Sequence, residues 1–147
     1  MFVPASIDLT GGFEIAAPPD LAFEFFSPVG EKAWVPGWDP ELLHPPGVSW
    51  ARGQIFRTQE ERGEAVWVVV ALDRARHDVE YVRVEAGRYV ARVRVCCQPG
   101  DAAHTRVTVG YTFVGLSDAG NADIAVMSQA AFAEKMARWQ EWIGACV

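Results

Sequence analysis

The chain has 147 residues, of which 50% are hydrophobic and 22% charged, and its formal net charge is −6. These values are ordinary for a globular protein, so we expect a single domain over residues 1–147, and the acidic balance disfavours nucleic acid as a partner. No apolar run is long enough to span a bilayer, the N-terminus lacks a signal-peptide pattern, and three cysteines do not make a disulfide framework, which together predict a cytoplasmic protein.

The first third of the chain predicts one strand followed by two short helices. Apolar residues alternate over Ile7 to Ile15, with a bulge or bend expected at Gly11-Gly12. Pro18-Pro19-Asp20 ends this strand and can open a helix over Leu21 to Phe26, because proline is tolerated in a first turn. A second short helix is expected over Gly30 to Val35.

The middle of the chain predicts strands joined by short turns. A turn-rich stretch that includes Trp34 and Trp38 comes first, and Trp38 to Leu43 leads into a short second strand. Strand-forming residues then recur in five segments: Gln54 to Thr58, Ala65 to Leu72, Asp78 to Glu85, Arg88 to Gln98 and Thr105 to Val114. Connections this short, with glycine, proline and aspartate in them, are typical of an antiparallel sheet with one face exposed to water.

The last stretch, Ser117 to Val147, has the apolar period of one long amphipathic helix. Ser128 falls inside its apolar stripe and Lys135 at the edge of the stripe, and either Asp118 or Asn121 could cap its start. So wide an apolar face needs a surface to pack on. We therefore expect an α+β fold in which a curved antiparallel sheet of six to seven strands surrounds the C-terminal helix, with two short helices after the first strand.

This order of elements resembles the START-like superfamily (SRPBCC), which includes polyketide cyclases, plant pathogenesis-related allergens and lipid-transfer domains. The best local match is Phe13 to Ser27, FEIAAPPDLAFEFFS, which is similar to the first strand, proline break and first helix of that superfamily. Trp34 to Leu43 and a terminal helix ending in Trp139 and Trp142 are also similar. The resemblance implies a helix-grip fold with a cavity between sheet and helix, usually for an apolar or amphipathic small molecule, but it leaves the activity open.

Aromatic residues are the main candidates for the lining of such a cavity. Eight of them fall on elements that would face one interior: Trp34, Trp38, Trp67, Tyr81, Tyr89, Tyr111, Phe132 and Trp139. Most of the set must be hydrophobic core. The resemblance makes two positions equally well supported, in the pocket wall or in the hydrophobic core, for four of them: Trp38, Trp67, Tyr81 and Trp139.

Two cations present an alternative that the sequence leaves open. Arg83 follows Tyr81 on the same side of its strand, so it enters the cavity if that side faces inward. It would then need a carboxylate such as Glu85 or an anionic group of the ligand, because burying an unpaired charge is costly. The interpretation that we favour is an edge strand, with Arg83 incompletely buried and Lys135 extending to water.

Other chemistry has weak support. His44, His77 and His104 lie in or beside predicted turns without metal-ligand spacing, so we expect solvated histidines, no metal and no cofactor. Cys96 and Cys97 are adjacent on a strand and point to opposite sides, which predicts one buried and one exposed thiol, both inert.

These observations favour a protein that binds a small hydrophobic or amphipathic molecule between the sheet and the C-terminal helix, at a mouth near Trp34 to Leu43. The expected ligand-binding residues are Trp38, Trp67, Tyr81, Arg83, Ser128, Lys135 and Trp139. One alternative is an enzyme like the polyketide cyclases and aromatases, with Tyr81, Arg83 or Ser128 moving or orienting protons, and another is a co-chaperone-like protein-interaction module. The sequence places no histidine or carboxylate in the cavity, which favours binding over catalysis. It leaves a homodimer open.

Overall fold

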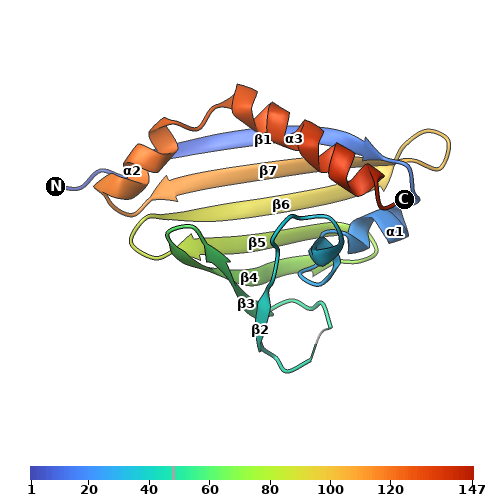
Figure 1. Cartoon of the computed structure of the whole chain (residues 1–147), viewed down its shortest axis with the longest axis horizontal. Coiled ribbons are helices and arrows are strands. Elements are labelled where there is room, and N and C mark those ends of the chain that lie inside the picture. The colour runs from blue at the N-terminus through green and yellow to red at the C-terminus, as the bar shows by residue number, and fades with distance from the viewer. Residues whose placement is uncertain (48) are drawn as a thin grey trace.

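A computed structural model describes residues 1–47 and 49–147, and in this part of the chain a seven-stranded antiparallel sheet is partly covered by helices on one face (Figure 1). In chain order the elements are β1 (Ser6–Ile15), α1 (Pro19–Glu24), the 3₁₀ helix η1 (Gly30–Ala33), β2 (Glu41–His44), β3 (Ile55–Glu60), β4 (Gly63–Asp73), β5 (Asp78–Glu85), β6 (Tyr89–Pro99), β7 (Thr105–Gly115), α2 (Asp118–Ala125) and α3 (Gln129–Gly144). None of the helices described is long and apolar enough to cross a membrane. The predicted α+β helix-grip architecture is confirmed.

The strands follow the order β1-β7-β6-β5-β4-β3-β2, so the first strand pairs with the last one. The β5 strand has the predicted bounds but lies between β4 and β6, and the edge-strand interpretation of Arg83 is therefore wrong. Sequence pattern alone could not establish this, because strand order is set by pairings between distant segments. The register of β1 with β7 runs without a shift from Ser6 to Ile15, so the bulge expected at Gly11-Gly12 is not formed.

Gly11 has a different role, which is to let α3 approach the sheet. The helix crosses β1 and β7 (Figure 1), and its residues Phe132 and Met136 are buried against them. A Cβ atom at Gly11 would lie 2.8 Å from Met136 Cγ and 3.2 Å from Phe132 Cε2. A glycine inside a strand often marks such a close approach.

The single helix expected over Ser117 to Val147 is wrong, because the chain breaks into α2 and α3. Ser117 caps α2 and Ser128 caps α3, and each side-chain oxygen accepts the backbone N–H three residues further on at 3.1 Å. Neither Asp118 nor Asn121 is the N-cap. Ser128 therefore does not belong to an inward-facing stripe. Serine is among the preferred N-cap residues because its hydroxyl satisfies a donor that the first helical turn leaves free.

The polar side of α3 covers the outer edge of β1. The side-chain amide of Gln129 accepts from Thr10 N at 3.2 Å and donates to Thr10 O at 2.5 Å. About three turns further along the same face of the helix, Gln140 Oε1 accepts from Glu14 N at 3.0 Å. Backbone groups that an edge strand normally presents to solvent are thus bound by side chains of the same molecule.

Candidate functional site

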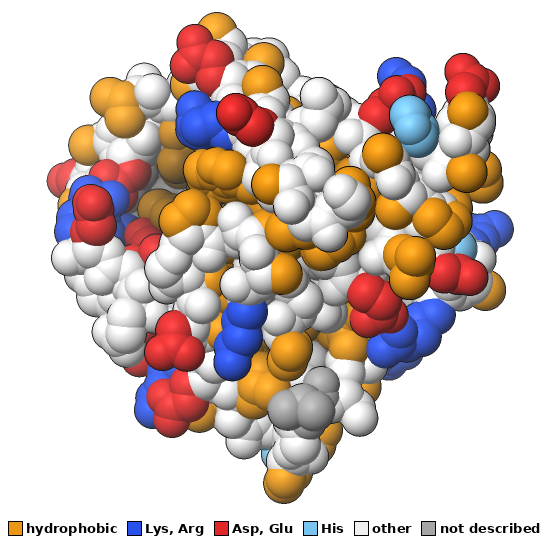
Figure 2. Space-filling model, turned by 45° about the vertical axis from the view of Figure 1, so that its right-hand side comes forward, with side chains coloured by type: hydrophobic (Ala, Val, Ile, Leu, Met, Phe, Trp, Pro, Cys, Tyr) orange, Lys and Arg blue, Asp and Glu red, His pale blue; other side chains and the backbone are white. Residues whose placement is uncertain are grey.

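A pocket of about 620 Å³ lies between the sheet and α3. Its lining residues come from β3 to β7, from η1 and the loop after it, and from α3. Figure 2 shows a hollow with hydrophobic side chains inside and charged side chains of both signs around its rim. The exposed residues Pro36, Gly37 and Asp39 line the pocket, so the loop expected to form the mouth lies at its rim.

One wall of the pocket consists of packed aromatic rings. Phe56 and Trp67 stack with centroids 5.6 Å apart and planes 8° from parallel. Trp38 and Tyr81 meet Trp67 edge-on, at centroid distances of 5.6 and 6.0 Å. Trp67 donates its indole N–H to Thr58 Oγ1 at 3.1 Å, while Trp38 and Tyr81 each donate to a backbone carbonyl. Because the polar atoms of these rings are satisfied inside the protein, what the wall offers a ligand is apolar area.

Arg83 lies within the pocket and is neutralised by the protein itself. Its side chain is only 13% exposed, and it donates to Tyr89 Oη at 2.6 Å and to Glu85 Oε1 at 3.0 Å. Glu60 Oε1 is 3.3 Å away, and the guanidinium lies over the Trp67 ring. Burial lowers the pKa of Arg83, but the Tyr89 hydroxyl and the two carboxylates outweigh that effect and raise it overall. Glu85 is thus the partner that the sequence suggested for an inward-facing Arg83.

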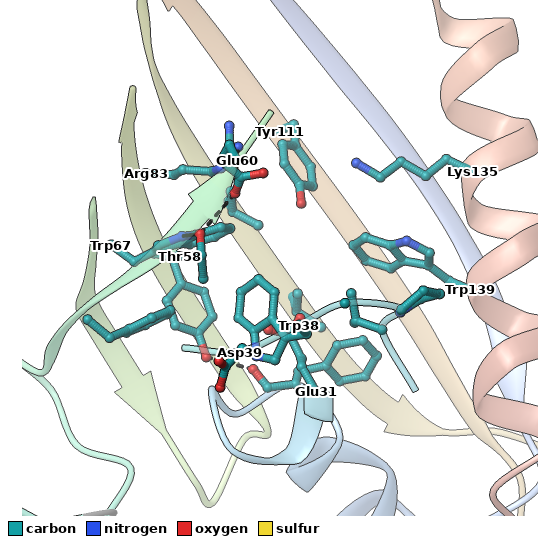
Figure 3. Close-up of a pocket in the computed structure, with 18 of the residues that line it drawn as sticks. Glu31, Trp38, Asp39, Thr58, Glu60, Trp67, Arg83, Tyr111, Lys135 and Trp139 are labelled. Carbon is teal, nitrogen blue, oxygen red and sulfur yellow. Dashed lines mark hydrogen bonds and ion pairs between the residues drawn. The ribbon is translucent and has the colours of Figure 1, made fainter. Parts of the chain in front are cut away.

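Lys135 also points into the pocket (Figure 3), which corrects the expectation that it extends to water. Its Nζ is 5.0 Å from the centroid of the Tyr111 ring and 5.4 Å from that of the Trp139 ring. No carboxylate of the described residues lies within 4.0 Å of it. Burial lowers the pKa of Lys135, and the positive charges of Arg83 and Arg138 lower it further. Among the described residues, the ammonium thus lies against aromatic faces, while Glu31 and Glu60 favour its charge only from beyond 4.0 Å.

Like Arg138, Glu31 is a pocket residue that sequence reasoning missed. Its carboxyl group lines the pocket from η1, and across residues 1–47 and 49–147 it has no hydrogen-bond or ion-pair partner. Burial raises the pKa of Glu31 well above its ordinary value, against a smaller lowering by Lys135. A four-residue 3₁₀ helix has no apolar period to show which face turns inward. Its placement depends on Gly30, where a Cβ would lie 1.9 Å from Glu24 O, so η1 packs directly on the end of α1.

The structure brings together most of the site residues expected from the sequence. Six of them line the pocket: Trp38, Trp67, Tyr81, Arg83, Lys135 and Trp139. Ser128 does not, because it is exposed at the N-terminus of α3. Figure 3 shows Lys135 and Arg83 toward one end of the pocket, with Glu31 and Asp39 toward the other.

The cysteines and His77 lie outside this pocket. Cys97 is buried and Cys96 half-buried, and burial raises the pKa of the two thiols to about 12 and about 11, so both stay protonated and unreactive at neutral pH. His77 is more covered than expected, with Nε2 2.6 Å from Asp20 Oδ1. Among the described residues, His, Cys, Asp and Glu side chains form no cluster of three or more that could hold a metal ion.

Comparison with known proteins gives structural matches only. No family model matches the chain, and no curated protein matches its sequence. Truncated norcoclaurine synthase from Thalictrum flavum is 12% identical, with a TM-score of 0.71 over 99% of this chain and 96% of that one. Zhui aromatase/cyclase from Streptomyces sp. R1128 is 16% identical, with a TM-score of 0.68 over 95% and 94%.

A third neighbour, the major latex-like protein 151 of Panax ginseng, is 15% identical, with a TM-score of 0.67 over 96% and 97% of the two chains. A further norcoclaurine synthase structure from Thalictrum flavum contains dopamine and hydroxybenzaldehyde; it is 12% identical, with a TM-score of 0.67 over 94% and 86%. All of these proteins have the helix-grip fold, and this chain has the same fold.

Proposed function

We propose that this protein binds a small hydrophobic or amphipathic molecule in the pocket between the sheet and α3. The observation that carries the proposal is an open volume of about 620 Å³ bordered by aromatic rings. Ligand pockets usually measure roughly 300–1,000 Å³ and combine apolar walls with a few polar groups, as this one does. A structure of the same fold contains dopamine and hydroxybenzaldehyde, which supports a small aromatic occupant.

The test is a binding measurement with a matched pair of variants. Trp38, Trp67 and Trp139 line the pocket, so the intrinsic tryptophan fluorescence of the protein should respond saturably to an occupant. The panel would contain fatty acids, aromatic polyketides and sterols, and native mass spectrometry would detect molecules that co-purify. Val93→Phe adds volume inside the pocket and should weaken binding, whereas Val90→Phe on the other face of β6 should not. No response to the whole panel and no co-purifying molecule would refute the proposal.

A second candidate function is catalysis of proton transfer on a bound carbonyl compound. Glu31 and Lys135 favour it, because an acid and a base face one pocket and neither has an ion-pair partner within 4.0 Å among the described residues. General acid–base catalysis needs such positioned groups with pKa values near the working pH. The test is proton–deuterium exchange at the central carbon of acetylacetone, followed by NMR. Exchange accelerated by the wild type and lost in Glu31→Gln would support an enzyme, and equal rates with and without protein would exclude this activity.

A further inference from the structure

Lys135 and Arg138 are two cationic residues at the α3 side of the pocket. The two residues are three positions apart on one helix, so their side chains lie on the same face, and both line the pocket. Arg138 is exposed at the rim, whereas Lys135 is half-buried further in. A ligand that enters the pocket along α3 would therefore pass one cation and reach the second.

Neither cation forms an ion pair with a carboxylate of the described residues. Within the described part of the chain, no carboxylate lies within 4.0 Å of Lys135 Nζ or of the Arg138 guanidinium. Glu134 is four residues before Arg138, a spacing that favours a helical ion pair, yet no such pair is formed and Arg138 lines the pocket. The arrangement leaves two positive charges facing a cavity.

Arg83 differs from Lys135 and Arg138 in having carboxylate partners. It lies in the same pocket but contacts Glu60 and Glu85, so its charge is already compensated. A half-buried ammonium without a carboxylate has lost hydration that its aromatic neighbours replace only in part. An anionic group on the occupant would complete the missing interaction, whereas a cationic occupant would meet two like charges. Across the pocket, burial raises the pKa of Glu31, which lessens its repulsion of an anion.

We propose that the occupant is a flat, largely apolar molecule with one anionic group, its rings against Trp67 and Trp139 and its anion between Lys135 and Arg138. A carboxylate or a sulfonate has the required charge and acceptor oxygens. This inference rests on the proposed binding function and narrows the chemical class of the ligand.

Two fluorescent probes with almost the same ring system distinguish the anion position from the general binding function. 1-Anilinonaphthalene-8-sulfonate carries a sulfonate, and N-phenyl-1-naphthylamine is its uncharged counterpart. We expect both to bind the wild type, with the sulfonate about tenfold tighter, as one charge-assisted hydrogen bond would give. Lys135→Met should remove most of that preference while leaving the neutral probe bound within about twofold, and Arg138→Gln should reduce the preference by roughly threefold, as expected for an exposed charge.

Lys32→Met is the matched control, since Lys32 is exposed on η1 and its loss changes the net charge by the same amount. It should leave the affinity for both probes unchanged. If the neutral probe binds as tightly as the sulfonate, or if the preference survives in Lys135→Met, the anion position is refuted and the binding function stands. If neither probe binds the wild type, the anion position is refuted as well, and the ligand panel decides the binding function separately. Thermal unfolding of each variant would verify that it remains folded.

Discussion

The two halves of the space beneath α3 differ although one helix borders both. Toward β1 the space is filled: the Phe13 ring meets Phe26 at 6.4 Å and Trp139 at 6.5 Å, and Trp34 fits between Phe26 and Trp139. Toward β3, β4 and β5 it is a pocket, although aromatic residues line it too. The type of residue therefore does not decide between core and cavity. What differs is spacing, because Gly11 brings α3 close to β1.

The largest effect is expected at the boundary between the halves. Trp139→Ala should lower the free energy of unfolding by about 3–5 kcal/mol, because the indole packs edge-on against Phe13 and Trp34. Trp142→Ala, on the same helix but only half-buried at the rim, should cost about 1 kcal/mol. Urea denaturation of the two variants measures the difference. Equal losses would mean that Trp139 is a pocket wall rather than part of the core.

The paired cation should matter more for folding than the unpaired one. Arg83→Met leaves Glu60 and Glu85 without their partner in a mostly buried place, and we expect a loss of about 3 kcal/mol. Lys135→Met removes a charge that has no carboxylate within 4.0 Å among the described residues, so stability should stay the same or rise. Chemical denaturation at one pH compares them. A stable Arg83→Met protein would show that the two carboxylates do not need the guanidinium.

The close approach of α3 to β1 predicts a smaller effect. Gly11→Val forces the new side chain against Met136 and Phe132, and we expect a loss of about 1–3 kcal/mol. Gly110→Val is the control on the neighbouring strand, where a Cβ meets nothing within 4 Å, and valine there should be neutral or slightly stabilising. Thermal unfolding of both proteins would test this. A neutral Gly11→Val would mean that the helix can move away without loss.

The smallest expected effect is the pH dependence of stability that is linked to Glu31 in the pocket. The pKa of Glu31 is raised in the folded protein above its ordinary value of 4.5, so the folded state keeps a proton that the unfolded chain releases. The stability linked to that proton is complete below about pH 4.5 and is lost as the pH rises through the folded-state pKa. Glu31→Gln has no titrating carboxyl group at this position, so its stability lacks this dependence on pH. The melting temperature of the variant relative to wild type should therefore increase with pH, and a constant difference from pH 4 to 8 would contradict the prediction.

The sequence predicted the fold well because strands and turns are local signals. The segment Asp78 to Glu85 was found with its bounds, since alternation and turn residues are visible within a few positions. The inward direction of Arg83 and the pocket position of Glu31 were not found, because they follow from strand order and from the packing of η1 on α1. The prediction for Ser128 is wrong for a different reason. The apolar period continues through Ser128, but serine is a preferred N-cap residue and here begins a new helix.

The hydrogen bonds of Gln129 and Gln140 to β1 have a consequence for behaviour at high concentration. An exposed sheet edge is a template on which a second molecule can add a strand, and repetition of that step gives fibrous aggregates. Here an incoming strand would first have to displace the side-chain amides from Thr10 and Glu14. The opposite edge is β2, which spans only Glu41–His44 and offers few positions for pairing. The same helix that borders the pocket thus also protects the molecule from self-association through its longest free edge.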